Sequence, residues 1–536
     1  MTGFLLSYCN FMPIKIIDLF AGPGGLGEGF SAFRNSAGDN PFRIKLSIEK
    51  EASAHQTLLL RAFYRQFTPG NIPSEYYDYL SGKLGKTPED QLYNINRYRK
   101  QIAKAREEAR QLTLGENNRS INRAIENALG KRPGNWVLLG GPPCQAYSLV
   151  GRSRNRGIKG YKAENDHRNF LYQEYLKVIS RFQPAVFIME NVKGLLSAKV
   201  ENKPIFPKIH EDLQCPARAL QSKDRRTEYE IFSLVDYDSN QSFFSDKFDP
   251  YKYVIKSENH GIPQARHRVI LLGIRKDILS KYEGQLLAKH KPPSTGEVLD
   301  DLPPLRSGIS KIIDNHQNWS NAIQQDIDKI ISAVESCGLK KVAYHMRKSV
   351  KIIQKTEFTR GSNWNNNLKS KIEIPGHILL EEWYKDESGW EGVCNHESRS
   401  HIASDLHRYL FCAAYGKAFG RESGSWSPKA NEFPKILAPK HSNWNTGKFS
   451  DRFRVQAKQR VATTITSHIS KDGHYFIHYD PVQCRSFTVR EAARIQTFPD
   501  NYFFVGNRTQ QYVQVGNAVP PFLARQIADI VYKLVV

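Results

Sequence analysis

The chain has 536 residues, of which 40% are hydrophobic, enough for a large core and two or more domains. Its formal net charge of +23 favours a polyanionic partner, most simply nucleic acid. Seven scattered cysteines without a CxxC pair indicate neither a disulfide framework nor a zinc cage, and they fit a reducing, cytoplasmic setting. No apolar run approaches the roughly 18 residues of a transmembrane helix, and residues 1–12 do not resemble a signal peptide. Met12, just before the first predicted strand, is an alternative start.

The first predicted elements form the opening of a nucleotide-binding α/β unit. Residues 14–19 predict a buried strand, a glycine-rich turn follows at 20–27, and residues 28–33 predict a helix. Glycines let the backbone approach a ligand closely, and the helix N-terminus favours negative charge. A second strand at 44–48 ends in Glu49, whose carboxylate is placed to hold ribose hydroxyls. We therefore expect a nucleoside-type cofactor at this turn.

The next segment has a different character. Residues 55–67 predict a helix, and residues 68–72 are the expected end of a third strand. Apolar residues then recur at helical spacing between Ile95 and Leu129, with arginine and lysine around them. This pattern predicts a basic helical hairpin inserted at 73–133. Its charges form either a solvated face or a direct contact to DNA.

The turn at 140–145 carries a candidate nucleophile. Residues 136–139 predict a buried strand, and two glycines and two prolines then form a rigid turn that presents Cys144. A lone cysteine is more often an apolar core residue, so the interpretation of Cys144 depends on its neighbours. Residues 151–160 are rich in glycine and arginine and predict a loop suited to closing over a phosphate backbone.

Later strands bring a carboxylate and two arginines toward this turn. Residues 166–182 predict a helix, and residues 184–189 predict a buried strand that ends at Glu190. Arg266 and Arg268 lie between two predicted strands, 253–255 and 269–274. Because an open α/β sheet gathers functional groups at the carboxyl ends of its strands, we expect these side chains to share one cleft with Cys144.

A thiol, a carboxylate and a guanidinium together fit the activation of an electron-poor ring. The thiolate adds to a ring carbon, the carboxyl group shares a proton with a ring nitrogen, and the guanidinium orients the carboxylate and a ring carbonyl. Each residue also has an ordinary structural role to offer. Glu190 could cap a helix, and Arg266 could donate to a surface ion pair.

Residues 306–448 lack the alternation of strand and helix. Proline, glycine, tryptophan, asparagine and basic residues dominate there, which predicts a second domain of irregular, loop-rich build that contacts phosphates and base edges. Ordered character returns at 461–466, 485–494 and 515–521, and a last helix extends through Val531. The first domain would therefore combine residues 13–305 with 449–536.

Six blocks in this order resemble the bacterial type of DNA (cytosine-5)-methyltransferase. They are DLFAGPGG at 18–25, GPPCQAYS at 141–148, ENV at 190–192, QARHR at 264–268, REAARIQTFP at 490–499 and GNAVP at 516–520. The resemblance spans nearly the whole chain except 73–133 and 306–448. It implies an α/β fold with the doubly wound sheet of S-adenosylmethionine-dependent methyltransferases, and a smaller target-recognition domain at 306–448.

The resemblance also implies S-adenosylmethionine as the cofactor. Phe20 would stack near the adenine, Glu49 would hold the ribose hydroxyls, and Asn71 stands in for the family's adenine-reading aspartate if 70–72 is that element. The implied cofactor-binding residues are Phe20, Ala21, Gly22, Gly24, Gly25, Leu26, Glu49, Asn71, Ile72, Pro143, Leu171, Asn517, Ala518 and Val519.

In the implied reaction a cytosine is flipped out of duplex DNA, Cys144 attacks its C6, and Glu190 holds the N3 edge, without a metal. The implied DNA contacts are Gln145, Ser148, Arg152, Arg154 and Arg156. The chain would act as a monomer on double-stranded DNA, within restriction-modification or phage defence. The alternatives are a tRNA cytosine-5 methyltransferase, a catalytically silent DNA-binding relative, and a nicotinamide-dependent oxidoreductase, in which the Pro-Pro-Cys turn has no role.

Overall fold

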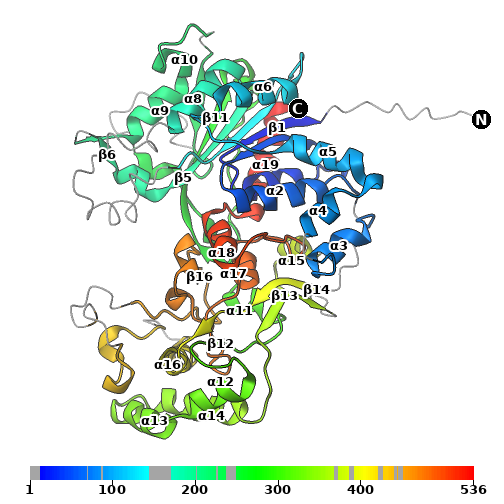
Figure 1. Ribbon diagram of the computed structural model, residues 1–536. Coiled ribbons are helices and arrows are strands. Elements are labelled where there is room, and N and C mark those ends of the chain that lie inside the picture. Colours follow the sequence, from blue (N-terminus) through cyan, green and yellow to red (C-terminus); the bar gives the residue numbers. More distant parts are fainter. Residues whose placement is uncertain are drawn as a thin grey trace, which may run out of the picture.

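The computed structural model describes residues 13–68, 70–85, 88–143, 171–200, 202–224, 227–236, 249–366, 372–385, 392–420, 426–439, 444 and 451–536. They form two lobes (Figure 1). The sheet lobe, at the top of the view, contains both chain ends of the described part. The helical lobe lies below it, and α17 (Val489–Ile495) and α18 (Arg508–Asn517) lie between the two.

The sheet lobe is built on an eight-stranded sheet in the order β3-β2-β1-β4-β5-β11-β8, with β9 also paired to β11. The first five strands of this order are parallel, and β11 runs antiparallel to β5, β8 and β9. The strands are β1 Ile14–Leu19, β2 Phe42–Glu49, β3 Ala109–Gln111, β4 Val137–Gly140, β5 Val186–Val192, β8 Tyr229–Phe232, β9 Val254–Lys256 and β11 His267–Arg275.

Helices cover both faces of this sheet, which explains why β1, β4 and β5 are nearly continuous apolar runs. On one face Ile16 and Ile44 pack with α1 (Gly25–Ser31) and α19 (Pro521–Val535). On the other, Ile17 and Leu138 pack with α6 (Asn118–Leu129), α8 (Leu171–Phe182) and α9 (Phe206–Gln214). The strands expected at 14–19, 44–48, 136–139, 184–189, 253–255 and 269–274 are confirmed.

The expected third strand is wrong. Residues 70–72 lie in the loop between α2 (Ala52–Tyr64) and α3 (Ser74–Leu80), and β2 instead pairs with β3, where Ser47 faces Ala109. β3 has only three residues, and two of them, Arg110 and Gln111, are exposed. An exposed edge strand this short has no run of apolar residues, so periodicity could not find it.

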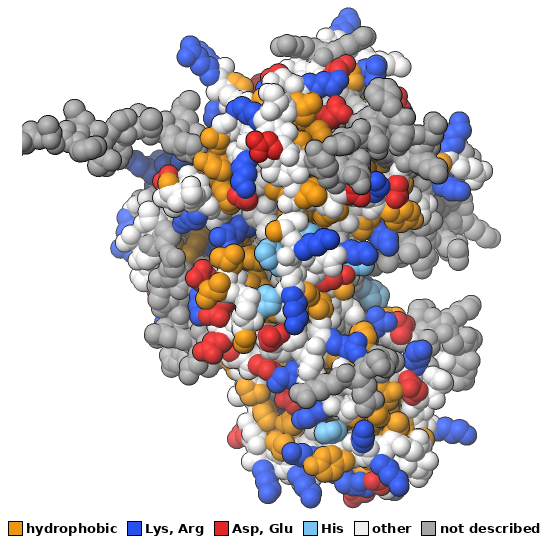
Figure 2. Space-filling view, turned by 180° about the vertical axis from the view of Figure 1, so that it is seen from behind, with side chains coloured by type: hydrophobic (Ala, Val, Ile, Leu, Met, Phe, Trp, Pro, Cys, Tyr) orange, Lys and Arg blue, Asp and Glu red, His pale blue; other side chains and the backbone are white. Residues whose placement is uncertain are grey.

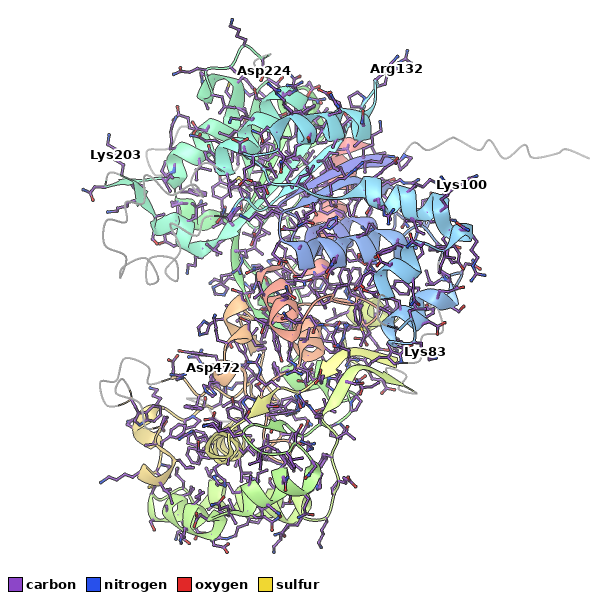
Figure 3. All side chains as sticks on the ribbon, viewed as in Figure 1. Lys83, Lys100, Arg132, Lys203, Asp224 and Asp472 are labelled. Carbon is purple, nitrogen blue, oxygen red and sulfur yellow. The ribbon has the colours of Figure 1, made fainter. Side chains whose placement is uncertain are left out.

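The predicted helical hairpin at 73–133 is also wrong. α5 (Arg99–Glu108) packs with α2 in one core, whereas α6 packs in the core on the other side of the sheet, and β3 separates them. Figure 3 shows Lys100 and Arg132 projecting from different parts of the sheet lobe. Between β2 and β3 the chain forms α2, α3, α4 (Pro88–Tyr93), a short turn and α5.

The region predicted to be irregular is largely helical. Its core joins α12 (His316–Gln324), α13 (Ile327–Ser336), α14 (Lys340–Ile353) and α16 (Ala403–Phe419) around Trp319. The same core includes Phe453, Ile477 and Cys484, so the helical lobe extends past residue 448. The sequence did not reveal α12, α13 and α14, because polar and basic residues on their outer faces interrupt the apolar pattern.

One piece of this region belongs to the sheet lobe. β13 (Gly361–Asn366) and β14 (Gly392–Glu397) form an antiparallel pair, and α15 (Ile378–Tyr384) lies between them in sequence. Tyr384 and Val393 join the core around α1 and α19, and Cys394 packs with α2. The chain therefore enters the helical lobe twice.

The shorter elements complete the described chain: α10 Pro216–Ala219, α11 Thr295–Leu299, β6 Lys199–Val200, β7 Lys203–Pro204, β10 Gln264–Ala265, β12 Gly308–Ile309, β15 Ser400–His401 and β16 Ala462–Thr463. On the face shown in Figure 2, lysine and arginine side chains are spread over both lobes instead of forming one stripe. Among the described residues, no helix is both long and apolar enough to cross a membrane.

Candidate active site

The glycine turn after β1 packs against the end of α18. Gly22 and Gly24 have φ of +56° and +95°, a left-handed conformation that favours glycine. A Cβ on Gly25 would lie 2.2 Å from the carbonyl oxygen of Val519, so only glycine fits there. The structure thus brings together residues 20–26 and 517–519, which the sequence analysis assigned to one pocket.

Glu49 closes this turn from the end of β2. Its Oε2 accepts a hydrogen bond from the Gly22 amide at 2.9 Å, and its Oε1 accepts from the amides of Lys50 and Glu51 at 2.9 and 2.8 Å. Burial raises the pKa of Glu49 above its usual value. The carboxylate is therefore fixed beside the glycines, although Gly22 itself is half exposed.

Asp18 is a residue of this site that the sequence analysis quoted without a role. Its side chain is 1% exposed and interacts with the backbone of Gly27, and no side chain donates to either carboxylate oxygen among the described residues. Burial, and next the nearby Glu49, raise the pKa of Asp18 to about 7. A Cβ on Gly22 would meet no atom within 4 Å, so open space lies in front of the turn. Open space beside the fixed Glu49 carboxylate fits a polar nucleoside cofactor.

The Pro-Pro turn is locked to the end of β5. Asn191 Nδ2 donates a hydrogen bond to the Pro142 carbonyl at 3.0 Å, and a Cβ on Gly141 would lie 3.1 Å from Glu190 Oε2. Gly140 leaves room for the Tyr175 ring, which would lie 2.4 Å from an added Cβ. These contacts hold half-buried Pro143 beside Glu190. The next residue, the predicted nucleophile, lies outside the described residues, as do the predicted DNA contacts Gln145, Ser148, Arg152, Arg154 and Arg156.

Glu190 and Arg268 form an ion pair on adjacent strands. Arg268 Nε lies 2.9 Å from Glu190 Oε1, and the two side chains are 13% and 14% exposed. Arg268 also donates to the His267 carbonyl at 2.9 Å. Burial lowers the pKa of Arg268, and Glu190 opposes this shift. The structure thus places the Glu190 carboxylate and the Arg268 guanidinium in contact.

Arg266 has a different environment. Its side chain is fully buried, and its two terminal nitrogens donate to the carbonyls of Ile465, Gly516 and Ala518 at 2.7, 3.2 and 2.8 Å. The pKa of Arg266 is lowered by burial. The hydrogen bonds of Arg266 thus go to the backbone of the segments after β16 and α18, and not to Glu190. Repeated arginines in one motif gave no signal that could separate these two roles.

Two other predicted cofactor residues, Leu171 and Asn71, have unlike surroundings. Leu171 is half-buried at the start of the described part of α8. Asn71 is exposed, and its Nδ2 donates to Thr68 Oγ1 at 2.8 Å. Because 70–72 does not follow a strand, Asn71 and Ile72 do not occupy the place expected for an adenine-reading element. The chain leaving β3 lies beside the end of β2 instead, since Leu112 N donates to the Glu49 carbonyl at 3.2 Å.

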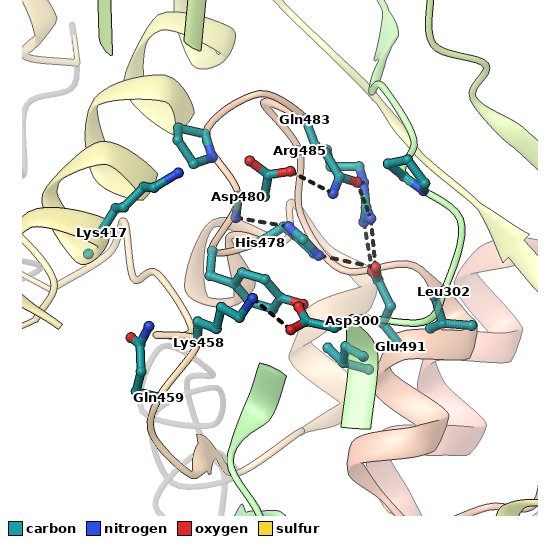
Figure 4. Close-up of a pocket in the computed structure, with 15 residues that line it drawn as sticks. Asp300, Leu302, Lys417, Lys458, Gln459, His478, Asp480, Gln483, Arg485 and Glu491 are labelled. Atoms are coloured by element: carbon teal, nitrogen blue, oxygen red, sulfur yellow. Dashed lines mark hydrogen bonds and ion pairs between the residues drawn. The ribbon is translucent and has the colours of Figure 1, made fainter. Parts of the chain in front are cut away.

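A cavity of about 550 Å³ lies elsewhere, where α11, α16 and the segment before α17 meet (Figure 4). Arg485 donates to both Glu491 oxygens at 2.6 Å, and His478 Nε2 lies 3.4 Å from the same carboxylate. These side chains are nearly fully buried and satisfy one another. The cavity therefore belongs to the junction of the lobes, and none of the predicted catalytic or cofactor residues lines it.

The doubly wound sheet, with its glycine turn and strand-end carboxylates, defines the fold of S-adenosylmethionine-dependent methyltransferases. A crystal structure of a DNA modification methyltransferase encoded within an E. coli prophage matches it with a TM-score of 0.51 at 17% identity, covering 97% of this chain and 99% of that one. This likeness shows the fold.

Sequence comparisons identify the family. The model of the C-5 cytosine-specific DNA methylase family matches residues 86–216 and 238–533. Type II methyltransferase M.Bpa9945I of Bacillus paralicheniformis is 31% identical, over 96% of this chain and 99% of that protein. Type II methyltransferase M.AgeI of Thalassovita gelatinovora is 25% identical, over 96% of this chain and 98% of that protein. The chain belongs to the C-5 cytosine-specific DNA methylase family and is a DNA (cytosine-5-)-methyltransferase of the type II kind.

Proposed function

We propose that this enzyme methylates C5 of one cytosine in a specific duplex sequence through a covalent adduct between Cys144 and C6. The observation that carries the proposal is the Glu190–Arg268 pair beside the locked turn that leads directly into Cys144. A thiol placed there would have an acid for the base edge within the same group of residues.

The Cys144 thiolate would add to C6 of a flipped cytosine while Glu190 shares a proton with N3, so that C5 becomes nucleophilic. C5 would then form the new carbon–carbon bond to the methyl group as the bond between that methyl group and the cofactor sulfur breaks, which leaves S-adenosylhomocysteine. Transfer of the C5 proton to a water molecule and release of the Cys144 sulfur from C6 would restore the ring and the thiolate. Arg268 holds the Glu190 carboxylate in place throughout.

S-adenosylmethionine, when bound, supplies the electrophilic methyl group. We assign Glu49 to its ribose hydroxyls and Phe20 to stacking near its adenine. The glycines of 22–25 would let the cofactor lie close to the backbone, and residues 517–519 and Pro143 would form the pocket wall. The adenine-reading group is assigned to the chain after β3, at 112–114, instead of to Asn71.

We assign target recognition to the helical lobe and infer that the enzyme is the methylating half of a restriction-modification system. The similarity to type II methyltransferases supports that inference. We also infer that the enzyme acts as a monomer on DNA of the bacterial nucleoid. Whole-genome bisulfite sequencing of a host expressing the chain would give the target sequence, and methyl transfer to duplex DNA and tRNA side by side would test the substrate class.

The adduct is tested with a duplex that carries 5-fluorocytosine at the target, since fluorine at C5 blocks the final elimination. Wild-type enzyme should form a complex stable to denaturing electrophoresis, and Cys144→Ala should form none. Cys337→Ala is the matched control, because Cys337 is an exposed cysteine of the helical lobe. An adduct in Cys144→Ala, or methylation by that variant at the wild-type rate, would overturn the mechanism.

A further inference from the structure

A second cavity, of about 660 Å³, lies on the sheet lobe between α15, the start of α19 and the loop before α11. None of the residues assigned above to cofactor, base or DNA lines it. Phe33, Leu380 and Phe522 form buried apolar walls. Ile378 and Leu379 are 62% and 56% exposed at its rim. A volume in this range with mainly apolar walls is typical of small-molecule sites.

Arg525 lines this cavity without an acidic partner. Its guanidinium lies 5.9 Å from the ring centres of both Trp383 and Phe522, and it makes no hydrogen bond or ion pair with any described residue. Burial lowers the pKa of Arg525, and Glu382 opposes this shift from beyond ion-pair distance. This half-buried guanidinium keeps its donors free of any described acceptor, so they are open to a ligand in the cavity.

The acidic side chains of the cavity are already engaged. Glu297 accepts from the Ser294 amide at 2.6 Å in the capping box of α11, and Asp529 pairs with Lys533 at 2.8 Å. Lys291, by contrast, has no ion pair among the described residues and lines the same cavity. Glu297 and Asp529 keep their negative charges, and Lys291 is close enough to Glu297 to help lower its pKa, so the two cations of the lining without an ion pair among the described residues are Arg525 and Lys291.

Three histidines complete the lining. His260, His290 and His377 all face the cavity. Burial lowers the pKa of His260 and of His377, so both are neutral at pH 7. The single N–H of His260 is on Nδ1, which donates to the Ala288 carbonyl at 2.8 Å, so its Nε2 is an acceptor, whereas His377 can offer one N–H. Two cations and a neutral imidazole on an apolar floor select a ligand that is anionic at one end and apolar at the other.

We propose that this cavity binds a small organic anion, a carboxylate or related acid on an aromatic or aliphatic body, with the acid on Arg525 and Lys291 and the body against Phe33, Phe522 and Leu380. The site is independent of the methylation chemistry proposed above.

Fluorescence titration with 8-anilinonaphthalene-1-sulfonate tests the site, with the full chain and saturating S-adenosylhomocysteine present. The probe should bind, 4-phenylbutyrate should displace it, and the matched cation 4-phenylbutylamine should not. Arg525→Gln should weaken probe binding about tenfold, because one charge-assisted hydrogen bond contributes roughly that factor. Arg181→Gln is the matched control, since Arg181 is an exposed arginine of α8 paired with Glu126.

Leu379→Ser provides a second variant that removes only exposed apolar surface, and it should weaken the probe severalfold without changing the melting temperature. Equal probe affinity in wild type and both variants would overturn the proposal. Displacement by phenylbutylamine as strong as by phenylbutyrate would also overturn it, because the charge would then play no part. Displacement by inorganic phosphate at the same concentration would overturn the assignment of an apolar body to the ligand.

Discussion

The strand edge of the sheet lobe and the junction between the lobes both bury charged groups, but they use them differently. At the strand edge, Glu190 and Arg268 remain partly exposed and pair with each other. At the junction, Arg485, Arg490 and Arg494 are at most 1% exposed, and each bonds to backbone carbonyls and to acidic or sulfur partners. Burial of charge therefore does not by itself locate chemistry, and the larger buried network serves assembly.

Glu190→Gln should give the largest effect and sharpens this contrast. Loss of a positioned acid lowers a rate by about 100- to 10,000-fold, and single-turnover methyl transfer at saturating DNA and cofactor measures it. The junction counterpart, Glu491→Gln, should lower the free energy of unfolding while folded molecules keep their rate. A rate loss in Glu491→Gln equal to that in Glu190→Gln would break the comparison.

Arg266→Met tests whether Arg266 belongs to the catalytic strand edge or to the buried structural network. The carbonyls of Ile465 and Gly516 lose the Arg266 donor, and that of Ala518 keeps only the one from Gln496, so the free energy of unfolding should fall by about 2 kcal/mol or more in urea titrations. Arg268→Met removes an ion pair near solvent and should cost less stability but more catalytic rate. If Arg266→Met left stability unchanged and removed activity, Arg266 would be catalytic as the sequence analysis expected.

Acidification should weaken the junction. His396 is fully buried, with its ring nitrogens 2.9 Å from Thr488 Oγ1 and 3.0 Å from the Pro303 carbonyl, and burial lowers its pKa to about 4. The folded pKa lies below the unfolded value, so this stability is present above about pH 6.5 and is lost as the pH falls toward 4. Between pH 7 and 5 the loss should be about 2 kcal/mol for this one group.

Urea unfolding at the two pH values measures this loss. His396→Gln should reduce the difference between them, whereas His468→Gln, which changes an exposed histidine, should leave it as in wild type. An unchanged pH difference in His396→Gln would assign the acid sensitivity to other groups.

Asn71→Ala should have the smallest effect. Because Asn71 is exposed and bonds only within its own loop, S-adenosylmethionine affinity measured by calorimetry should change less than twofold. Glu49→Gln, at the strand edge, should weaken it about tenfold, since a charge-assisted hydrogen bond is lost. A tenfold effect of Asn71→Ala would restore its predicted place beside the adenine.

The same contrast explains what the sequence could and could not predict. Strands β1, β2, β4 and β5 are buried on both faces, so their apolar runs reveal them, and the residues that follow them mark the site. β3 is too short and too polar to be visible. In the second lobe α12, α13 and α14 have polar outer faces, whereas α16 is buried nearly all round, and long-range packing around Trp319 and α16 defines this lobe.

The residues around each arginine also did not indicate which one pairs with Glu190. Arg266 and Arg268 both adjoin His267, and their partners lie on segments far away in sequence. Asn191 likewise needed the fold, because its bond to Pro142 joins two strand ends that are about 50 residues apart.

The return of β13, α15 and β14 to the sheet lobe bears on how new target specificities can arise. A single crossover that exchanged residues 306–448 with another enzyme would also replace Cys394, which accepts a hydrogen bond from Arg490 at 2.7 Å, and Tyr384, whose hydroxyl donates to the Arg494 carbonyl at 2.6 Å. Recombination that preserves a folded enzyme must therefore exchange two separate segments, one on each side of this return, and leave residues 361–397 in place.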